Sequence, residues 1–95
     1  VDLNMLIEIE TSIFPPTEIQ VWGGNSPDDL TLITRKKIEM PAVYRKPYIE
    51  LIGCEFEEQT VSYLKIVAKP VMKLPAWHKN KDKAALILID EILIN

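Results

Sequence analysis

The side chains best suited to ligand chemistry gather in one segment, residues 74–83, with the sequence Leu-Pro-Ala-Trp-His-Lys-Asn-Lys-Asp-Lys. Recognition of a sugar needs an aromatic face that lies against the apolar C–H groups of the ring, and a few polar groups directed at its hydroxyls. Trp77, His78 and Asn80 supply that combination, so we predict them as glycan-binding residues. The alternative is that Trp77 packs as a plug at one end of the domain, and the sequence leaves both roles open.

The same segment does not predict catalysis. His78 is the only histidine, and no pattern places a nucleophile beside it, so we interpret it as a solvated or hydrogen-bonded structural residue. The adjacent carboxylates Asp90 and Glu91 cannot flank a glycosidic bond from within one strand, because neighbouring side chains there point to opposite faces. Gly23 and Gly24 are too short a run for a phosphate-binding loop and are predicted to form a turn. We therefore expect no catalytic centre in this chain.

Composition is that of an ordinary folded domain. The 95 residues, 47% hydrophobic and 26% charged, fit one domain spanning residues 1–95. No apolar run approaches the roughly 20 residues that a membrane-spanning helix needs. The single cysteine, Cys54, excludes an internal disulfide and is predicted as a buried strand residue.

The charged residues are unevenly distributed. The net charge is -3, residues 1–34 contain no Lys or Arg, and all eleven basic residues lie between Arg35 and Lys83. A nucleic-acid-binding surface normally shows a clear basic excess, so the acidic total argues against nucleic acid as a partner. Charge segregated in this way predicts two faces that are solvated differently. Trp22, at the end of an alternating stretch, is predicted to pack or to contact another domain rather than to serve as a sugar platform.

Short apolar stretches punctuated by seven prolines and three glycines predict an all-β domain. The expected strands are residues 3–9, 17–22, 30–37, 48–57, 61–68 and 84–94. The fourth and fifth are expected to pair as a hairpin through residues 58–60. The last stretch has a helical alternative, but its β-branched residues favour a strand buried on both faces. Residues 23–29 are predicted as a turn and residues 40–47 as an irregular connection.

Four segments together resemble a known family: residues 13–24, 63–70, 74–78 and 90–92. They look like the C-terminal discoidin-like domain, of the galactose-binding-like superfold, that is appended to bacterial β-N-acetylhexosaminidases (chitobiases). The resemblance implies an antiparallel jelly-roll β-sandwich, here apparently lacking its first strands, as a C-terminal fragment of a larger glycoside hydrolase. It also implies that residues 84–94 form a strand.

In function, the resemblance implies a non-catalytic, carbohydrate-associated accessory domain that binds glycan weakly or supports the catalytic domain of the same polypeptide. The glycan would contain N-acetylglucosamine or galactose, and the location would be periplasmic, outer-surface or secreted. No cofactor is expected other than a calcium ion, for which Glu91 could offer an oxygen. Because the chain starts after the strands that carry most calcium and sugar ligands in that family, a complete metal site is not expected. The competing hypotheses are a purely structural β-sandwich without a ligand and, less favoured, an independent hydrolase.

Overall fold

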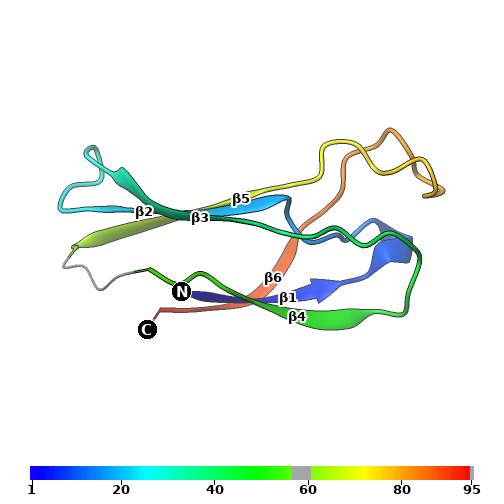
Figure 1. Cartoon of the computed structure of the whole chain (residues 1–95), viewed down its shortest axis with the longest axis horizontal. Coiled ribbons are helices and arrows are strands. Elements are labelled where there is room, and N and C mark those ends of the chain that lie inside the picture. The colour runs from blue at the N-terminus through cyan, green and yellow to red at the C-terminus, as the bar shows by residue number, and fades with distance from the viewer. Residues whose placement is uncertain (57–60, 95) are drawn as a thin grey trace.

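A computed structural model describes residues 1–56 and 61–94 of the chain. Within these residues the protein is all-β, with one three-residue 3-10 helix, η1 (Ile9–Thr11), and no α-helix. Two antiparallel three-stranded sheets, β4-β1-β6 and β3-β2-β5, form two layers (Figure 1). The strands are β1 (Asp2–Ile7), β2 (Glu18–Gly24), β3 (Thr31–Lys37), β4 (Tyr48–Gly53), β5 (Tyr63–Lys69) and β6 (Leu88–Leu93). The expected all-β class is confirmed, and the two layers are compatible with a β-sandwich.

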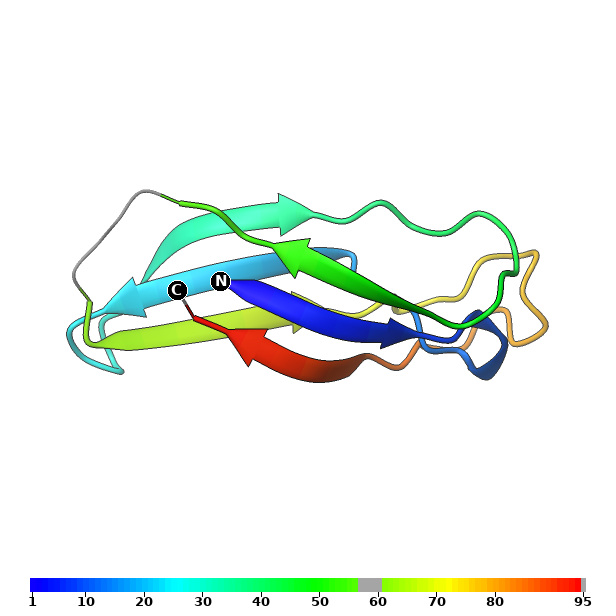
Figure 2. The same cartoon turned by 90° about the horizontal axis from the view of Figure 1, so that it is seen from below.

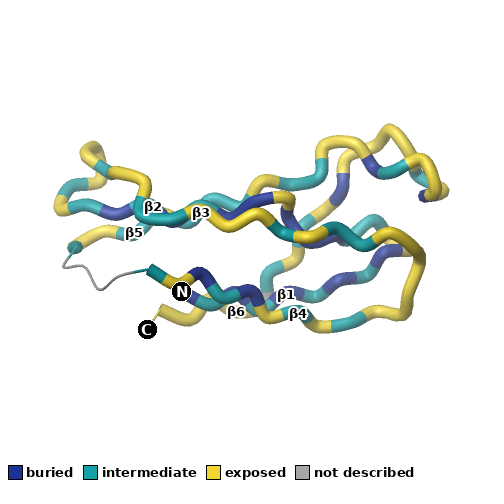
Figure 3. The backbone as a smooth tube through the Cα atoms, in the orientation of Figure 1, coloured by how far each residue is buried: buried dark blue, intermediate teal, exposed yellow. Residues whose placement is uncertain are grey.

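The central strand of each sheet supplies most of the core. In β1, Leu3, Met5 and Ile7 alternate with partly exposed residues and are completely buried, as a period of two requires of a strand with one inward face. Ile19 and Val21 of β2 are buried against them from the other layer. Figure 3 shows the buried residues, in dark blue, recurring along both strands. The core therefore lies between the two central strands.

The expected hairpin between the fourth and fifth strands is wrong. β4 pairs with β1, with Leu3 opposite Ile52, whereas β5 pairs with β2, with Val21 opposite Ile66. The residues expected to form the hairpin connection, 58–60, lie outside the described residues. Alternation shows which face of a strand is buried but not which strand becomes its neighbour. Here β4 and β5 each take an edge position beside a more deeply buried central strand, in different sheets.

The last stretch is a strand, but the expectation that both its faces are buried is wrong. β6 is an edge strand with β1 as its neighbour, and even the inward-facing Ile92 is 44% exposed. The strand also begins later than expected, at Leu88. β-branched residues favour extended backbone wherever it lies, so they do not distinguish an edge strand from a central one.

Gly23 and Gly24 belong to β2 rather than to the turn, which occupies residues 25–29. Neither glycine has a positive φ; among the described residues, positive φ values occur at Ser12 and Asp82. A Cβ added at Gly24 would lie 2.2 Å from the carbonyl oxygen of Asp29. Glycine is therefore required here because the returning chain approaches closely, not because of backbone conformation.

Candidate functional site

The loops at one end of the molecule form the candidate site. Residues 70–87, between β5 and β6, lie at the same end as residues 38–47, between β3 and β4, and as η1 (Figures 1 and 2). Residues 40–47 are irregular, as expected from the prolines that bound them. Segments far apart in sequence are thus brought together at the edge of the core.

His78 holds the long loop to η1. The residue is only 2% exposed, and Nε2 hydrogen-bonds to the carbonyl oxygen of Ile9. Nδ1 accepts a hydrogen bond of 3.0 Å from the backbone N–H of Asn80. These partners assign the neutral tautomer with the proton on Nε2. Of the two roles expected for this residue, solvated or hydrogen-bonded, the structure shows the hydrogen-bonded one, and both ring nitrogens are engaged inside the protein.

Trp77 combines packing with exposure. Its ring centroid lies 5.1 Å from that of Tyr44 in an edge-to-face arrangement and 6.3 Å from that of Phe14. The residue nevertheless remains 36% exposed. One side of the indole therefore packs on the rings of Tyr44 and Phe14, which with Trp77 form an aromatic cluster, and a ligand can still contact the rest of the indole.

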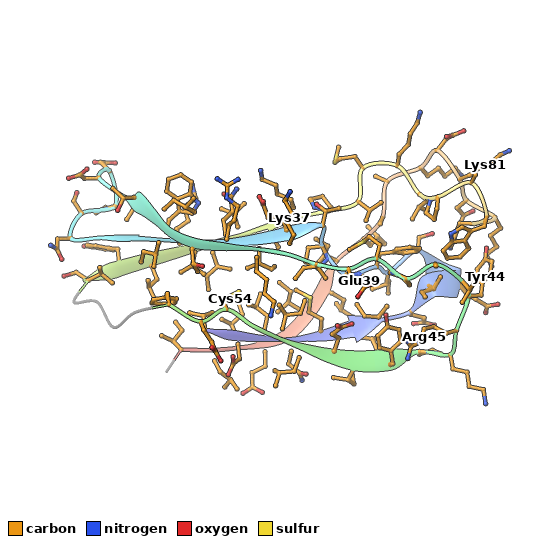
Figure 4. The ribbon with its side chains drawn as sticks, in the orientation of Figure 1. Lys37, Glu39, Tyr44, Arg45, Cys54 and Lys81 are labelled. Carbon is orange, nitrogen blue, oxygen red and sulfur yellow. The ribbon has the colours of Figure 1, made fainter. Side chains whose placement is uncertain are left out.

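Asn80 and Tyr44 fix the loop on its two sides. The Nδ2 of Asn80 donates a 3.0 Å hydrogen bond to Oγ of Ser12, which follows η1. The backbone N–H of Lys79 donates to the hydroxyl oxygen of Tyr44 over 2.7 Å. Tyr44 lies in the connection that leads to β4, so this contact joins the two loops at the position labelled in Figure 4.

A hollow of about 280 Å³ lies next to the aromatic cluster. Its volume is near the lower end of small-molecule pockets, which begin at roughly 300 Å³. Carboxylates, cations and one aromatic ring line it: Glu8, Glu10, Tyr44, Arg45, Lys46 and Pro47. The guanidinium of Arg45 lies 3.9 Å from the centroid of the Tyr48 ring, a cation–π contact that fixes its position. The hollow therefore offers hydrogen-bond donors and acceptors beside an aromatic edge.

The sequence did not indicate Glu8, Tyr44 or Arg45. The only signal for Tyr44 and Arg45 is that an aromatic residue and an arginine stand together in an irregular stretch bounded by prolines, and Glu8 has no such signal. That signal acquires meaning once the stretch is known to lie beside residues 70–87. Trp77, His78 and Asn80 do lie together as expected, but the polar atoms described for His78 and Asn80 are bound within the protein.

Glu91 and Trp22 lie elsewhere. Glu91 is exposed on β6 opposite Asn4, and no group of three or more His, Cys, Asp or Glu side chains converges in the described part of the chain. The calcium role of Glu91 thus stays a prediction, since the described residues place no second and third ligand of these four residue types beside it. Trp22 is half-buried on β2, where its indole N–H donates to Gln20.

No protein-family model matches the chain, and no curated protein matches it either. Residues 1–56 and 61–94 contain no helix of the length and hydrophobicity needed to cross a membrane.

Proposed function

We propose that the chain is a non-catalytic accessory domain of a glycoside hydrolase of the β-N-acetylhexosaminidase type, with a jelly-roll, discoidin-like sandwich. The proposal is supported by the sequence resemblance and is compatible with the two antiparallel sheets. The catalytic domain of the same polypeptide is the proposed partner. The proposed location is periplasmic, outer-surface or secreted.

In this proposal the end bearing Trp77 contacts glycan. The observation that carries it is the partly exposed indole packed edge-to-face on Tyr44, which itself lines the 280 Å³ hollow. A sugar ring would lie against the exposed part of Trp77, and Glu8 and Arg45 would bond its hydroxyls from the hollow. A shallow site with one partly exposed ring fits weak binding, because little of the ligand is removed from water.

Titration calorimetry with N-acetylglucosamine, chitobiose and galactose tests this function. We expect weak binding of at least one of them, its loss in Trp77→Ala and its weakening in Arg45→Gln. The matched control is Arg35→Gln, which removes the same charge from β3. Absence of heat from all three sugars up to millimolar concentrations in the native protein would contradict glycan binding at this end.

The second candidate is a structural module without a ligand. It is favoured by the contacts of His78 and Asn80, which serve the loop itself, and by the aromatic neighbours of Trp77. The third, an independent hydrolase, predicts turnover of a chromogenic N-acetylglucosaminide that is lost when Asp90 or Glu91 is changed. We expect no turnover.

A further inference from the structure

The two sheets differ in charge. The strands of β4-β1-β6 contain four acidic residues and no Lys or Arg. Those of β3-β2-β5 contain five basic residues and one acidic residue, Glu18. In a chain whose net charge is -3, the second sheet is therefore a local basic surface. Such a surface attracts anions even when the whole molecule is acidic.

Most of these cations lie on the side of the sheet that faces away from the core. Ile19 and Val21 of β2 point inward and are buried, so Glu18, Gln20 and Trp22 form the central column of the outer face. Directly paired residues of neighbouring antiparallel strands share a face. The basic residues paired with this column are Lys37 and Lys69 beside Glu18, Arg35 beside Gln20, and Lys65 beside Trp22. Figure 4 shows Lys37 on this upper side of the sheet.

The central column is fixed by side-chain hydrogen bonds. The indole N–H of Trp22 donates to Oε1 of Gln20 over 3.0 Å, and Nε2 of Gln20 donates to Oε2 of Glu18 over 2.8 Å. Glu18 also lies 3.3 Å from Nζ of Lys69 and 3.8 Å from Nη1 of Arg35. These bonds orient the indole and the amide before any ligand arrives, which reduces the entropy lost on binding.

The one acid of this face is covered while the cations are not. The side chain of Glu18 is 11% exposed, compared with 54% for Lys69 and 57% for Arg35. A molecule that approaches the sheet therefore meets positive charge first. Leu32, paired with Trp22 on the other side, adds a partly exposed apolar contact next to the indole.

We propose that the outer face of β3-β2-β5 binds an anionic polysaccharide, with Trp22 against a sugar ring and the flanking Arg and Lys side chains against its carboxylate or sulfate groups. The face is three strands wide, so the cations of β3 and β5 lie roughly 10 Å apart on either side of the aromatic column. A linear polymer along or across the strands can contact both rows. A single tryptophan and one amide suit a sugar ring better than successive stacked bases, which need several aromatic side chains.

This site is separate from the end that bears Trp77. β2 leads away from that end, toward the opposite loops at residues 25–30 (Figure 1). The proposal goes beyond the glycan contact proposed above and does not depend on it. If the neutral sugars fail to bind at Trp77, the proposal for the basic face still stands. If the acidic polysaccharides fail to bind at the basic face, the proposal for the Trp77 end still stands.

The test uses tryptophan fluorescence in a Trp77→Phe background, in which Trp22 is the only tryptophan. The probes are polygalacturonate for carboxylates, dextran sulfate for sulfates, hydroxyethyl cellulose as a neutral chain and a single-stranded DNA oligonucleotide. We expect one or both acidic polysaccharides to bind at about 50 mM salt and to change the tryptophan emission. Their affinity should fall at least about tenfold when the salt concentration rises to about 200 mM. If only one of them binds, its acid group is the one recognised, and if both bind, the face accepts either group. No binding of either at low salt, equal binding of the neutral chain, or tighter binding of the DNA would overturn the proposal.

The matched variants locate the site. Lys37→Glu/Lys65→Glu should weaken polysaccharide binding at least about tenfold, because each change replaces an attraction with a repulsion at the face. Lys79→Glu/Lys81→Glu changes the net charge equally in the loop and should have a much smaller effect. If the first double variant melts early, Lys37→Gln/Lys65→Gln gives the same comparison with less perturbation. Equal losses from both lysine pairs would show that net charge alone attracts the polymer, and the site would be withdrawn.

Discussion

The imidazole of His78 hydrogen-bonds to the backbone carbonyl of Ile9, 69 positions earlier in the chain. The same ring accepts a hydrogen bond from the N–H of Asn80, so one buried side chain joins the longest loop to η1 and sets the turn that follows it. The aromatic surface of Trp77 depends on this anchor, because Trp77 is the residue directly before it.

His78→Phe should therefore destabilise the protein although it preserves a buried ring. It removes one of two donors to the Ile9 carbonyl, which keeps the hydrogen bond from the Ser12 N–H, and it leaves the Asn80 N–H without its acceptor. An unsatisfied donor costs about 1–3 kcal/mol, and the loss of a single hydrogen bond costs less. We expect a loss of about 1–3 kcal/mol in the free energy of unfolding, measured with urea. Lys81→Ala, an exposed change in the same loop, should stay within about 0.5 kcal/mol. Equal stability of His78→Phe and the native protein would show that the anchor is unimportant.

Trp77→Ala should cost less than the loss of a fully buried tryptophan. A buried Trp→Ala change costs about 3–5 kcal/mol, but this indole is already 36% exposed, so we expect about 1–3 kcal/mol. Trp77→Phe should recover most of the loss, since a smaller ring can still contact Tyr44 and Phe14. Thermal and urea unfolding measure both variants. A loss of 4 kcal/mol or more would instead identify Trp77 as the buried plug.

The two glycines at Gly24 and Gly53 should respond differently to alanine. At Gly24 the new Cβ would lie 2.2 Å from the backbone oxygen of Asp29, so the chain itself must move, and overpacking of this kind costs about 1–3 kcal/mol. At Gly53 the nearest atom is a side-chain oxygen of Asp2 at 3.1 Å, which can rotate away. We expect Gly53→Ala to stay within about 0.5 kcal/mol of the native stability. Urea unfolding of the matched pair checks the difference.

Glu18 should make stability depend on acid pH. Its pKa is held below the ordinary value of 4.5 chiefly by the hydrogen bond from Gln20, with help from Lys69 and Arg35 and against the effect of burial. Because the folded pKa lies below the unfolded one, this contribution is present above the unfolded pKa and is lost as pH falls through the folded value. Glu18→Gln should lower stability at pH 7 and flatten the decline below about pH 4.5. Glu55→Gln, an exposed change, should lower stability at pH 7 less than Glu18→Gln does.

The thiol of Cys54 should resist labelling in the native protein. Cys54 is buried, and burial raises its pKa above the ordinary value of 9.0, with Asp2 adding to the effect and Lys36 and the N-terminal amine opposing it. Only the thiolate reacts, so a disulfide reagent at neutral pH should label the chain at the rate of unfolding. Fast labelling without denaturant would contradict this. Since the folded pKa is the higher one, stability should also fall as pH rises past 9.

Much of the strand pattern followed from the sequence because alternation is local. β1 and β5 each begin and end within two residues of the predicted limits, and β3 differs by one residue at its start. The burial of Cys54 was also predicted correctly, but its expected place in a strand is wrong, because β4 ends one residue earlier, at Gly53. Each of these features depends on residues only a few positions apart, so a period of two is enough to show them.

Only the tertiary structure decided which strands pair and which functional side chains lie next to one another. β4 and β5 are consecutive in the chain and could pair as a hairpin, yet they lie in different layers. Any two strands offer similar backbone hydrogen bonds, so the choice of partner depends on which side chains are buried together. The same is true of the sites. Tyr44 meets Trp77, and the basic rows flank Trp22, through contacts between residues far apart in sequence. A single strand or loop specifies its own side chains, but it does not contain the neighbours that determine what they can bind.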